Sequence, residues 1–318
     1  VFRQTAEFLG EVLLEPALQN GAFLPDVVSG ERLNLENTIA ARINDKRTWA
    51  TSELLRVMCA GEAYGVPRLG ELEDVRALDE KNLYAHYRAL LTHSQVEIFY
   101  MGSHTPDAAA EAFREALRDL PRGEITSCGT VVVPKADAVR KEERALDVTQ
   151  GKLVLGFRTG CTLTDAEFPA LLMMNAIYGG GITSKLFMKV REELSLCYYA
   201  MSTLEKFKGV MLVSSGIDCA QRDVAQAEIL RQLDAVRAGD ISDYEFESAR
   251  RYLRSSLSTG MDSPGRLDDF YIGQLIAGQP DTMQALSERI ARVTKDDVAA
   301  AARRVSLDTV FFLKGVQA

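Results

Sequence analysis

The sequence is poor in histidine, with only His86, His93 and His104 among 318 residues. His86 and His93 lie two helical turns apart, but no third ligand follows them at helical spacing. Neither H-E-x-x-H nor H-x-x-E-H occurs, and these motifs are how a helix offers zinc two histidines beside a catalytic glutamate. The pattern favours surface or satisfied histidines, so we expect no metal site in this chain.

Other classes of protein are excluded by what is scarce. The five cysteines are odd in number and never form C-x-x-C, which argues against a disulfide framework or a thiolate zinc site and indicates a reducing compartment. There is no lysine-arginine block and the net charge is -8, which argues against nucleic acid. No apolar run approaches the ~18 residues of a membrane span, and the first residues lack a signal-peptide pattern. We therefore expect a cytoplasmic protein with neither a nucleic acid nor a membrane as partner.

The chain is long enough for two domains, and its 47% apolar residues can supply two cores. Residues 72–102 and 289–315 share an order of aliphatic stretch, turn, helix and strand, ending in I-F-Y-M-G and V-F-F-L-K-G. This internal similarity indicates a duplicated domain. By the same comparison the first half lacks a strand region that precedes the second half's first helix, so we expect residues missing upstream of Val1.

The connector between the halves has its own composition, with prolines, glycines and the charged run R-K-E-E-R. We predict a first domain over residues 1–120, a linker over 121–147 and a second domain over 148–318. The patterns predict strands, which are residues 95–102 (buried), 130–133, 152–159 and 309–315, and a hairpin of 196–204 with 208–217. Without regular βαβ alternation, this order indicates an α+β fold in which helices cover antiparallel strands.

The most distinctive stretch is residues 179–199. The glycine turn Gly179-Gly180-Gly181 precedes an amphipathic helix over 183–194, with Arg191 in its last turn and Tyr198 early in the next strand. Such a pair can offer one cleft a fixed cation and a phenolic donor, which a developing oxyanion needs. The alternative is an ordinary salt bridge of Arg191 with a neighbouring glutamate and a half-buried strand tyrosine.

The three glycines also have two interpretations. They lack the spacing and the lysine-serine pair of a phosphate-binding loop. Their plain role is to end one helix with a positive φ and to start another. A second role, and the one we assign as substrate-binding, is close approach of the backbone at Gly179, Gly180 and Gly181 to a bound peptide.

Residues 179–199 resemble the second-domain signature of the M16 peptidases, the family of insulinase, pitrilysin and mitochondrial processing peptidase. Arg191 and Tyr198 match the arginine-tyrosine pair of that signature. The resemblance implies two homologous α+β domains of the LuxS/MPP-like metallohydrolase type, each an antiparallel sheet covered by helices, with the first truncated at its N-terminus. Residues 41–46 and 62–65, A-R-I-N-D-K and E-A-Y-G, are similar to the non-catalytic YmfF-type members.

Active M16 members bind zinc through H-x-x-E-H and a later glutamate. In this chain Thr38 stands at the position expected for that glutamate, and a hydroxyl cannot replace a carboxylate on zinc. The resemblance therefore implies a zinc-free subunit that is peptidase-like but inactive on its own. Its expected partners are a peptide substrate and a zinc-bearing M16 sibling that carries H-x-x-E-H. In this heterodimer Arg191 and Tyr198 would act in trans as donors to the transition state or the substrate.

Two alternatives stay open. The chain can be part of a self-sufficient zinc peptidase whose H-x-x-E-H lies upstream of Val1, although Thr38 weighs against a complete zinc site. It can also be a structural or peptide-binding protein that kept the M16 fold without the chemistry, because a fold does not fix a function.

Overall fold

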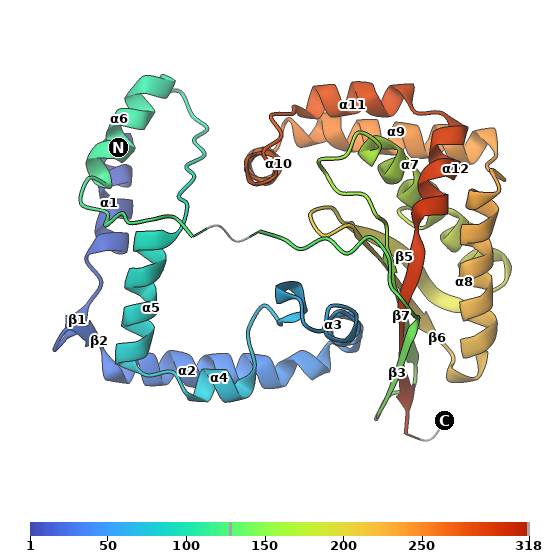
Figure 1. Ribbon diagram of the computed structural model, residues 1–318, viewed down its shortest axis with the longest axis horizontal. Coiled ribbons are helices and arrows are strands. Elements are labelled where there is room, and N and C mark those ends of the chain that lie inside the picture. Colours follow the sequence, from blue (N-terminus) through green and yellow to red (C-terminus); the bar gives the residue numbers. More distant parts are fainter. Residues whose placement is uncertain (127–128, 317–318) are drawn as a thin grey trace. The chain divides into compact units, whose positions relative to one another are not determined.

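The computed structural model describes residues 1–126 and 129–316. They form two compact units, one of Val1–Ala41 with Arg68–Gly129 and one of Arg42–Pro67 with Thr130–Ala318 (Figure 1). Residues Arg42–Pro67 therefore belong to the second unit, whereas the predicted limits placed them in the first domain. The similarity of the two halves, on which those limits depend, remains a prediction. Within the described ranges, no helix combines the length and the apolar character that a membrane crossing requires.

The first unit is mainly helical. Its elements are α1 (Phe2–Leu14), β1 (Leu18–Gln19), β2 (Ala22–Phe23), α2 (Pro25–Ala41), α4 (Leu72–Arg76), α5 (Glu80–His93) and α6 (Pro106–Ala116). The hairpin of β1 and β2 turns at Asn20 and Gly21, whose φ angles are 53° and 77°, as in the tight turns that favour these residues. Helix α1 packs closely on α6, because a Cβ at Gly10 would lie 2.3 Å from the carbonyl oxygen of Ala116.

The predicted buried strand over residues 95–102 is wrong. This segment forms no strand in the structure, and Val96, Ile98 and Met101 are each more than two-fifths exposed. The sequence is strand-like in composition, but a strand also needs a neighbour to accept its backbone hydrogen bonds. In the described part of this unit the only sheet is the hairpin of β1 and β2, which have two residues each. It gives residues 95–102 no strand to pair with.

The second unit is built around a five-stranded sheet in the order β3-β7-β4-β6-β5. Its elements are η1 (Arg42–Asn44), α3 (Lys46–Met58), η2 (Ala63–Gly65), β3 (Arg140–Leu146), β4 (Gly151–Arg158), α7 (Phe168–Tyr178), η3 (Leu186–Glu193), β5 (Cys197–Glu205), β6 (Val210–Ile217), η4 (Cys219–Gln221), α8 (Arg222–Arg237), α9 (Asp243–Gly260), α10 (Pro264–Ile276), α11 (Met283–Arg292), α12 (Lys295–Arg304) and β7 (Ser306–Gly315). The predicted hairpin is confirmed as β5 and β6.

Two details of the predicted sheet are wrong. Residues 130–133 form no strand, whereas the charged run of the predicted linker forms β3. Strand β3 pairs in parallel with β7, so the sheet is mixed, and its other strand pairs are antiparallel. Charged side chains are tolerated there because β3 is an edge strand, where they remain in solvent and discourage further pairing.

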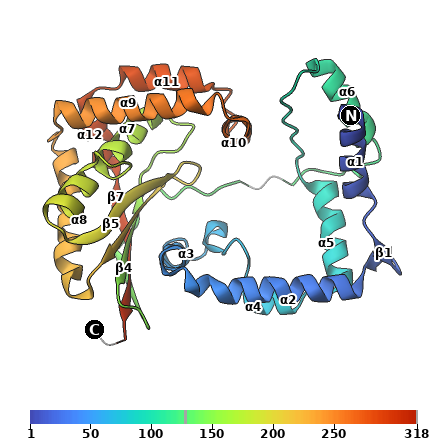
Figure 2. The ribbon, with the colours of Figure 1, turned by 180° about the vertical axis from the view of Figure 1, so that it is seen from behind.

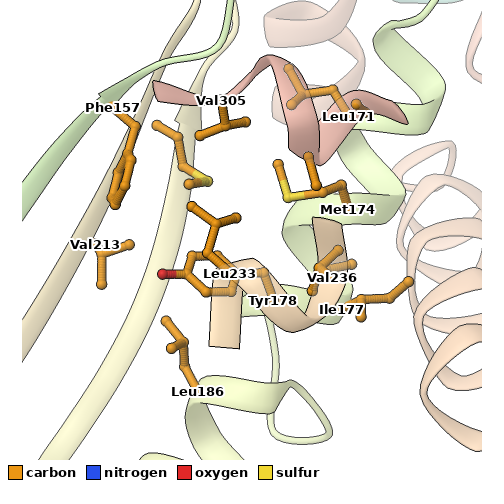
Figure 3. Packing of buried hydrophobic residues seen from close by; sticks show 14 of the residues in the cluster. Phe157, Leu171, Met174, Ile177, Tyr178, Leu186, Val213, Leu233, Val236 and Val305 are labelled. Atoms are coloured by element: carbon orange, nitrogen blue, oxygen red, sulfur yellow. The ribbon is translucent and has the colours of Figure 1, made fainter. Parts of the chain in front are cut away.

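Helices cover both faces of this sheet. Helices α7, α8, α9, α11 and α12 lie over one face, and α3 packs on the opposite face against β4 and β7 (Figures 1 and 2). On the first face, Phe157 and Val213 of the sheet meet Met174 and Tyr178 of α7 (Figure 3). Strands β4 and β6 are mostly apolar and nearly all of their residues are buried, as expected for central strands that are covered on both faces. The predicted α+β class, a sheet covered by helices, is confirmed.

A buried ionic cluster fastens the segment Arg42–Pro67 to the sheet. The guanidinium of Arg158 in β4, which is 1% exposed, pairs with Asp308 of β7 at 2.8 Å and with Glu62 at 2.8 Å. Glu62 also pairs with the ammonium group of Lys208. Removing one member of such a cluster leaves a buried charge without a partner. The cluster therefore holds this early segment in the second unit.

Candidate functional site

The backbone that carries Arg191 is unusual. The predicted amphipathic helix over 183–194 is present as η3, but η3 is a π-helix, in which amides bond to the carbonyl five residues earlier. The pattern continues where the amide of Leu194 donates to the carbonyl of Lys189 at 3.0 Å. π-Helices are rare and often occur at functional sites. Arg191 lies in the last turn of η3, as the sequence predicted for its helix.

Two further irregularities lie between Arg191 and Tyr198. Ser195 has φ of +50°, a conformation that few non-glycine residues adopt. The register of β5 against β6 then shifts between Cys197 and Tyr199, which leaves Tyr198 in a β-bulge. A bulge redirects the side chain it carries. Accordingly Tyr198 is 65% exposed, although Cys197 beside it is buried in the core.

Arg191 is positioned by two neighbours. Its guanidinium stacks over the ring of Phe187 at 4.6 Å and pairs with Glu192 at 3.5 Å, while its side chain remains 41% exposed. Burial raises the pKa of the Cys197 thiol, and a hydrogen bond with Ser215 and then the positive charge of Arg191 oppose that rise. No hydrogen bond joins Arg191 to Tyr198 in the described ranges. The two residues share one short stretch, and their role as donors stays a prediction.

Glycine is needed at the turn of residues 179–181 for a different reason from the one expected. None of its three residues has φ in the left-handed region, so the expected positive φ is wrong. The carbonyl of Gly179 accepts from the amide of Ser202 in β5 at 2.9 Å. A Cβ at Gly179 would lie 2.7 Å from the side chain of Leu186. Glycine at 179 therefore lets α7 end directly against β5 and η3, while peptide binding by Gly179, Gly180 and Gly181 stays a prediction.

A cluster next to the bulge was missed by sequence reasoning. Lys152 of β4, Gly216 of β6 and Tyr199 of β5 lie in one row across the sheet. Because Gly216 has no side chain, the ring of Tyr199 lies over it, where a Cβ would come 2.5 Å from a ring carbon. Arg47 of α3 covers the same ring at 4.5 Å, and the ammonium group of Lys152 lies 6.0 Å from its centre. The adjacent tyrosines are visible in the sequence, but the row depends on strand register.

The cluster brings two cations together. Desolvation lowers the pKa of Lys152, and the charge of Arg47 lowers it further. Arg47 also contacts the sulfur of Met201, and Lys152 donates to the side-chain oxygen of Gln150. Residues of like charge are held close only where other contacts compensate. Arg47, Lys152 and Tyr199 thus form a cationic patch, which we call the Arg47 cluster.

Thr38 lies in α2 of the first unit, on an exposed face. Its hydroxyl donates to the carbonyl of Asn34 at 2.8 Å, a bond within its own helix. A threonine hydroxyl does not supply the carboxylate that completes an M16-type zinc site. Over residues 1–126 and 129–316, no three side chains of histidine, cysteine, aspartate or glutamate are grouped so that they can hold a metal ion.

Comparison with known proteins identifies the family. The family model described as the peptidase M16 inactive domain matches residues 77–253, more than half of the chain. The chain belongs to the M16 peptidase family. A relative in this family is the probable inactive metalloprotease YmfF of Bacillus subtilis, 33% identical over 98% of this chain and 73% of the relative. An uncharacterized zinc protease of Streptomyces coelicolor is 28% identical over 92% of this chain and 66% of that protein.

Solved structures of similar fold agree with this assignment. A conserved protein from Enterococcus faecalis superposes with a TM-score of 0.92 at 29% identity, covering 100% of this M16 chain and 75% of that one. The peptidase M16 inactive domain from Pseudomonas fluorescens superposes with a TM-score of 0.78 at 18% identity, covering 98% of this chain and 74% of that one. At that identity the likeness shows the fold alone.

Proposed function

We propose that this M16 chain is a zinc-free subunit that is inactive as a peptidase on its own. It pairs with a sibling that carries H-x-x-E-H and supplies Arg191 and Tyr198 to the shared site. The observation that carries this proposal is the backbone from Leu186 to Tyr199, where a π-helix, a positive φ and a β-bulge surround these two exposed donors. The threonine at position 38 and the relative named as an inactive metalloprotease support the absence of a zinc site.

The two side chains suit hydrolysis of a peptide bond. Zinc on the partner subunit would activate water and polarise the scissile carbonyl. The guanidinium of Arg191 and the phenol of Tyr198 both donate hydrogen bonds, and a developing oxyanion or a peptide carbonyl accepts them. Arg191 is already oriented by the ring of Phe187, which limits the freedom it loses on binding.

The sheet offers a place for the peptide itself. Strand β5, which carries Tyr198, is the last strand of the described sheet and pairs only with β6 there. The amide of Ser202 on this edge already donates to the carbonyl of Gly179, so a peptide would pair with β5 before Ser202. An extended peptide adds to a strand edge by main-chain hydrogen bonds, while pockets for alternate side chains give specificity. A peptide on β5 would pass directly beside the bulge.

The test is peptide cleavage by the chain together with a zinc-bearing M16 sibling. We expect Arg191→Ala and Tyr198→Phe each to lower kcat by ~100-fold, the effect of losing one oxyanion donor. Matched controls are Arg251→Ala and Tyr244→Phe, an exposed arginine and an exposed tyrosine of α9 that should leave kcat unchanged. Unchanged turnover in both site variants would contradict the donor role.

One observation favours a second candidate, a peptide-binding protein without catalysis. The ion pair of Arg191 with Glu192 is the ordinary arrangement that needs no substrate. This candidate predicts that peptides bind the chain, that Arg191→Ala leaves this binding unchanged, and that no M16 sibling with H-x-x-E-H copurifies or supports turnover. Cleavage that depends on both chains decides between the two candidates.

A further inference from the structure

The Arg47 cluster contains two positive charges that lack a matching negative one. Among the described residues, neither Arg47 nor Lys152 forms an ion pair with a carboxylate. The carboxylate nearest in sequence is Asp45, but it caps α3, accepting from the amides of Arg47 at 3.2 Å and Thr48 at 3.1 Å and from the Thr48 hydroxyl at 2.6 Å. Its oxygens therefore bond the helix N-terminus and form no ion pair with the guanidinium, although the charge of Arg47 is the last of the causes that lower the pKa of Asp45.

The cluster is held in place by the fold. Arg47 comes from α3, which the buried ionic cluster of Arg158 and Glu62 fastens to the sheet, and Lys152 projects from a central strand. The phenol oxygen of Tyr199 lies 3.5 Å from the hydroxyl oxygen of Ser214, and Arg47 covers the tyrosine ring. Desolvation lowers the pKa of Lys152, and the charge of Arg47 lowers it further, as expected for a partly buried ammonium group near a second cation.

The donors present define the ligand chemistry. A guanidinium binds a carboxylate through two parallel hydrogen bonds, and an ammonium and a phenol add further donors. These groups sit in one row with the start of β5, beside the bulge at Tyr198. A peptide lying on the edge of β5 would bring its own negative groups to this row.

We infer that Arg47, Lys152 and the hydroxyl of Tyr199 form a carboxylate-binding subsite for the bound peptide. The inference rests on the proposed function only in taking the ligand to be a peptide. The carboxylate comes from the peptide C-terminus or from an acidic side chain. Gly216 lets the Tyr199 ring lie directly against the sheet, because any side chain there would displace that ring.

The subsite is tested by the reactivity of Lys152. The chain is labelled with acetic anhydride, and acetylation of each lysine is followed by mass spectrometry in the presence of three probes. These are N-acetyl-tetraalanine, its C-terminal amide, and the same amide with one alanine replaced by glutamate. We expect a probe that carries a carboxylate to protect Lys152 and the plain amide to leave it reactive, while the exposed Lys141 at the opposite sheet edge reacts equally throughout.

The comparison of the three probes identifies the source of the carboxylate. Protection by the free C-terminus alone assigns a C-terminal pocket, and protection by the glutamate probe alone assigns a side-chain pocket. Arg47→Gln should lower the affinity for the protecting probe about tenfold, as expected when a hydrogen bond to a charged group is lost. Lys141→Gln, which removes the same charge as a lysine substitution in the subsite, should leave the probe's affinity unchanged.

The inference is overturned if Lys152 is protected equally by the amide and the free acid, or if Arg47→Gln binds the protecting probe like the wild type. These results leave the proposed function standing when Arg191→Ala still lowers turnover with the zinc-bearing sibling. Conversely, protection of Lys152 with no effect of Arg191→Ala retains the subsite and rejects the donor role. The two failures are therefore distinguishable.

Discussion

Two segments of this chain have nearly the same strand-like pattern and opposite environments. Residues 97–102 read E-I-F-Y-M-G, and residues 310–315 of β7 read V-F-F-L-K-G. Strand β7 lies between β3 and β4, so Phe311 is 0% exposed. In the first segment, which has no strand neighbour in the described residues, the corresponding Ile98 is 46% exposed. The comparison teaches that composition makes a segment able to form a strand, whereas its neighbours decide whether it does.

The largest difference should appear when the matched apolar residues are truncated. We expect Phe311→Ala to lower the free energy of unfolding by about 4 kcal/mol, because it leaves a cavity between α3 and the sheet. Ile98→Ala should cost less than about 1 kcal/mol, since a half-exposed side chain loses little burial. Urea unfolding of both variants measures the difference. Equal costs would show that residues 97–102 are packed as tightly as β7.

A second pair of substitutions tests the polar end of each segment. Asp308→Asn removes the charge that pairs with Arg158 in a fully buried site, and we expect a loss of about 3 kcal/mol. The residue at the same offset from Ile98 is the exposed Gln95, so Gln95→Ala should be nearly neutral. Thermal unfolding compares the two variants. An unchanged melting temperature for Asp308→Asn would contradict the role of the buried cluster as an anchor of β7.

Acid should weaken the ion pairs by which Glu62 holds the segment Arg42–Pro67 to the sheet. Burial acts to raise the pKa of Glu62, but hydrogen bonds from Lys208 and Arg158 outweigh it and hold that pKa below the usual 4.5. A lowered pKa in the folded state means that the stabilisation is complete above pH 4.5 and is lost as pH falls through the folded value. Melting temperature against pH should therefore fall less steeply for Glu62→Gln than for the wild type in this window. Parallel curves would refute the linkage.

The smallest losses of stability should come from removing the N-caps of α5 and α12, and they should be equal in the two helices. Each segment follows a helix with a capping box, begun by Asp79 in α5 and by Thr294 in α12. We expect Asp79→Ala and Thr294→Ala each to cost about 1 kcal/mol, because the lost hydrogen bonds are local. Amide hydrogen exchange in the first turn of each helix measures the cost separately for each unit. A loss confined to one helix would show that capping there depends on tertiary contacts.

Local patterns in the sequence were reliable where the interaction itself is local. The hairpin of β5 and β6 pairs as predicted, and Arg191 lies in the last turn of a helix. These features depend on residues within a few positions of one another.

In the candidate site, too, only the features that depend on residues close in sequence could be predicted. Arg191 and Tyr198 were visible from their spacing, but neither the π-helix nor the bulge that redirects Tyr198 has a signature in residue type. Arg47 and Lys152 were not visible as a pair, because over a hundred positions separate them and only strand register and α3 packing bring them to Tyr199.

The sequence by itself determined the α+β class, the hairpin, the M16 signature and the threonine at position 38, because each is set by residue identity or by short-range periodicity. Only the tertiary structure decided that charged β3 is a strand while apolar residues 95–102 are not, that Arg42–Pro67 packs with the second unit, and that two cations share one tyrosine ring. The physical reason is that backbone pairing and charge proximity depend on what lies opposite in space, and distant parts of the chain supply it.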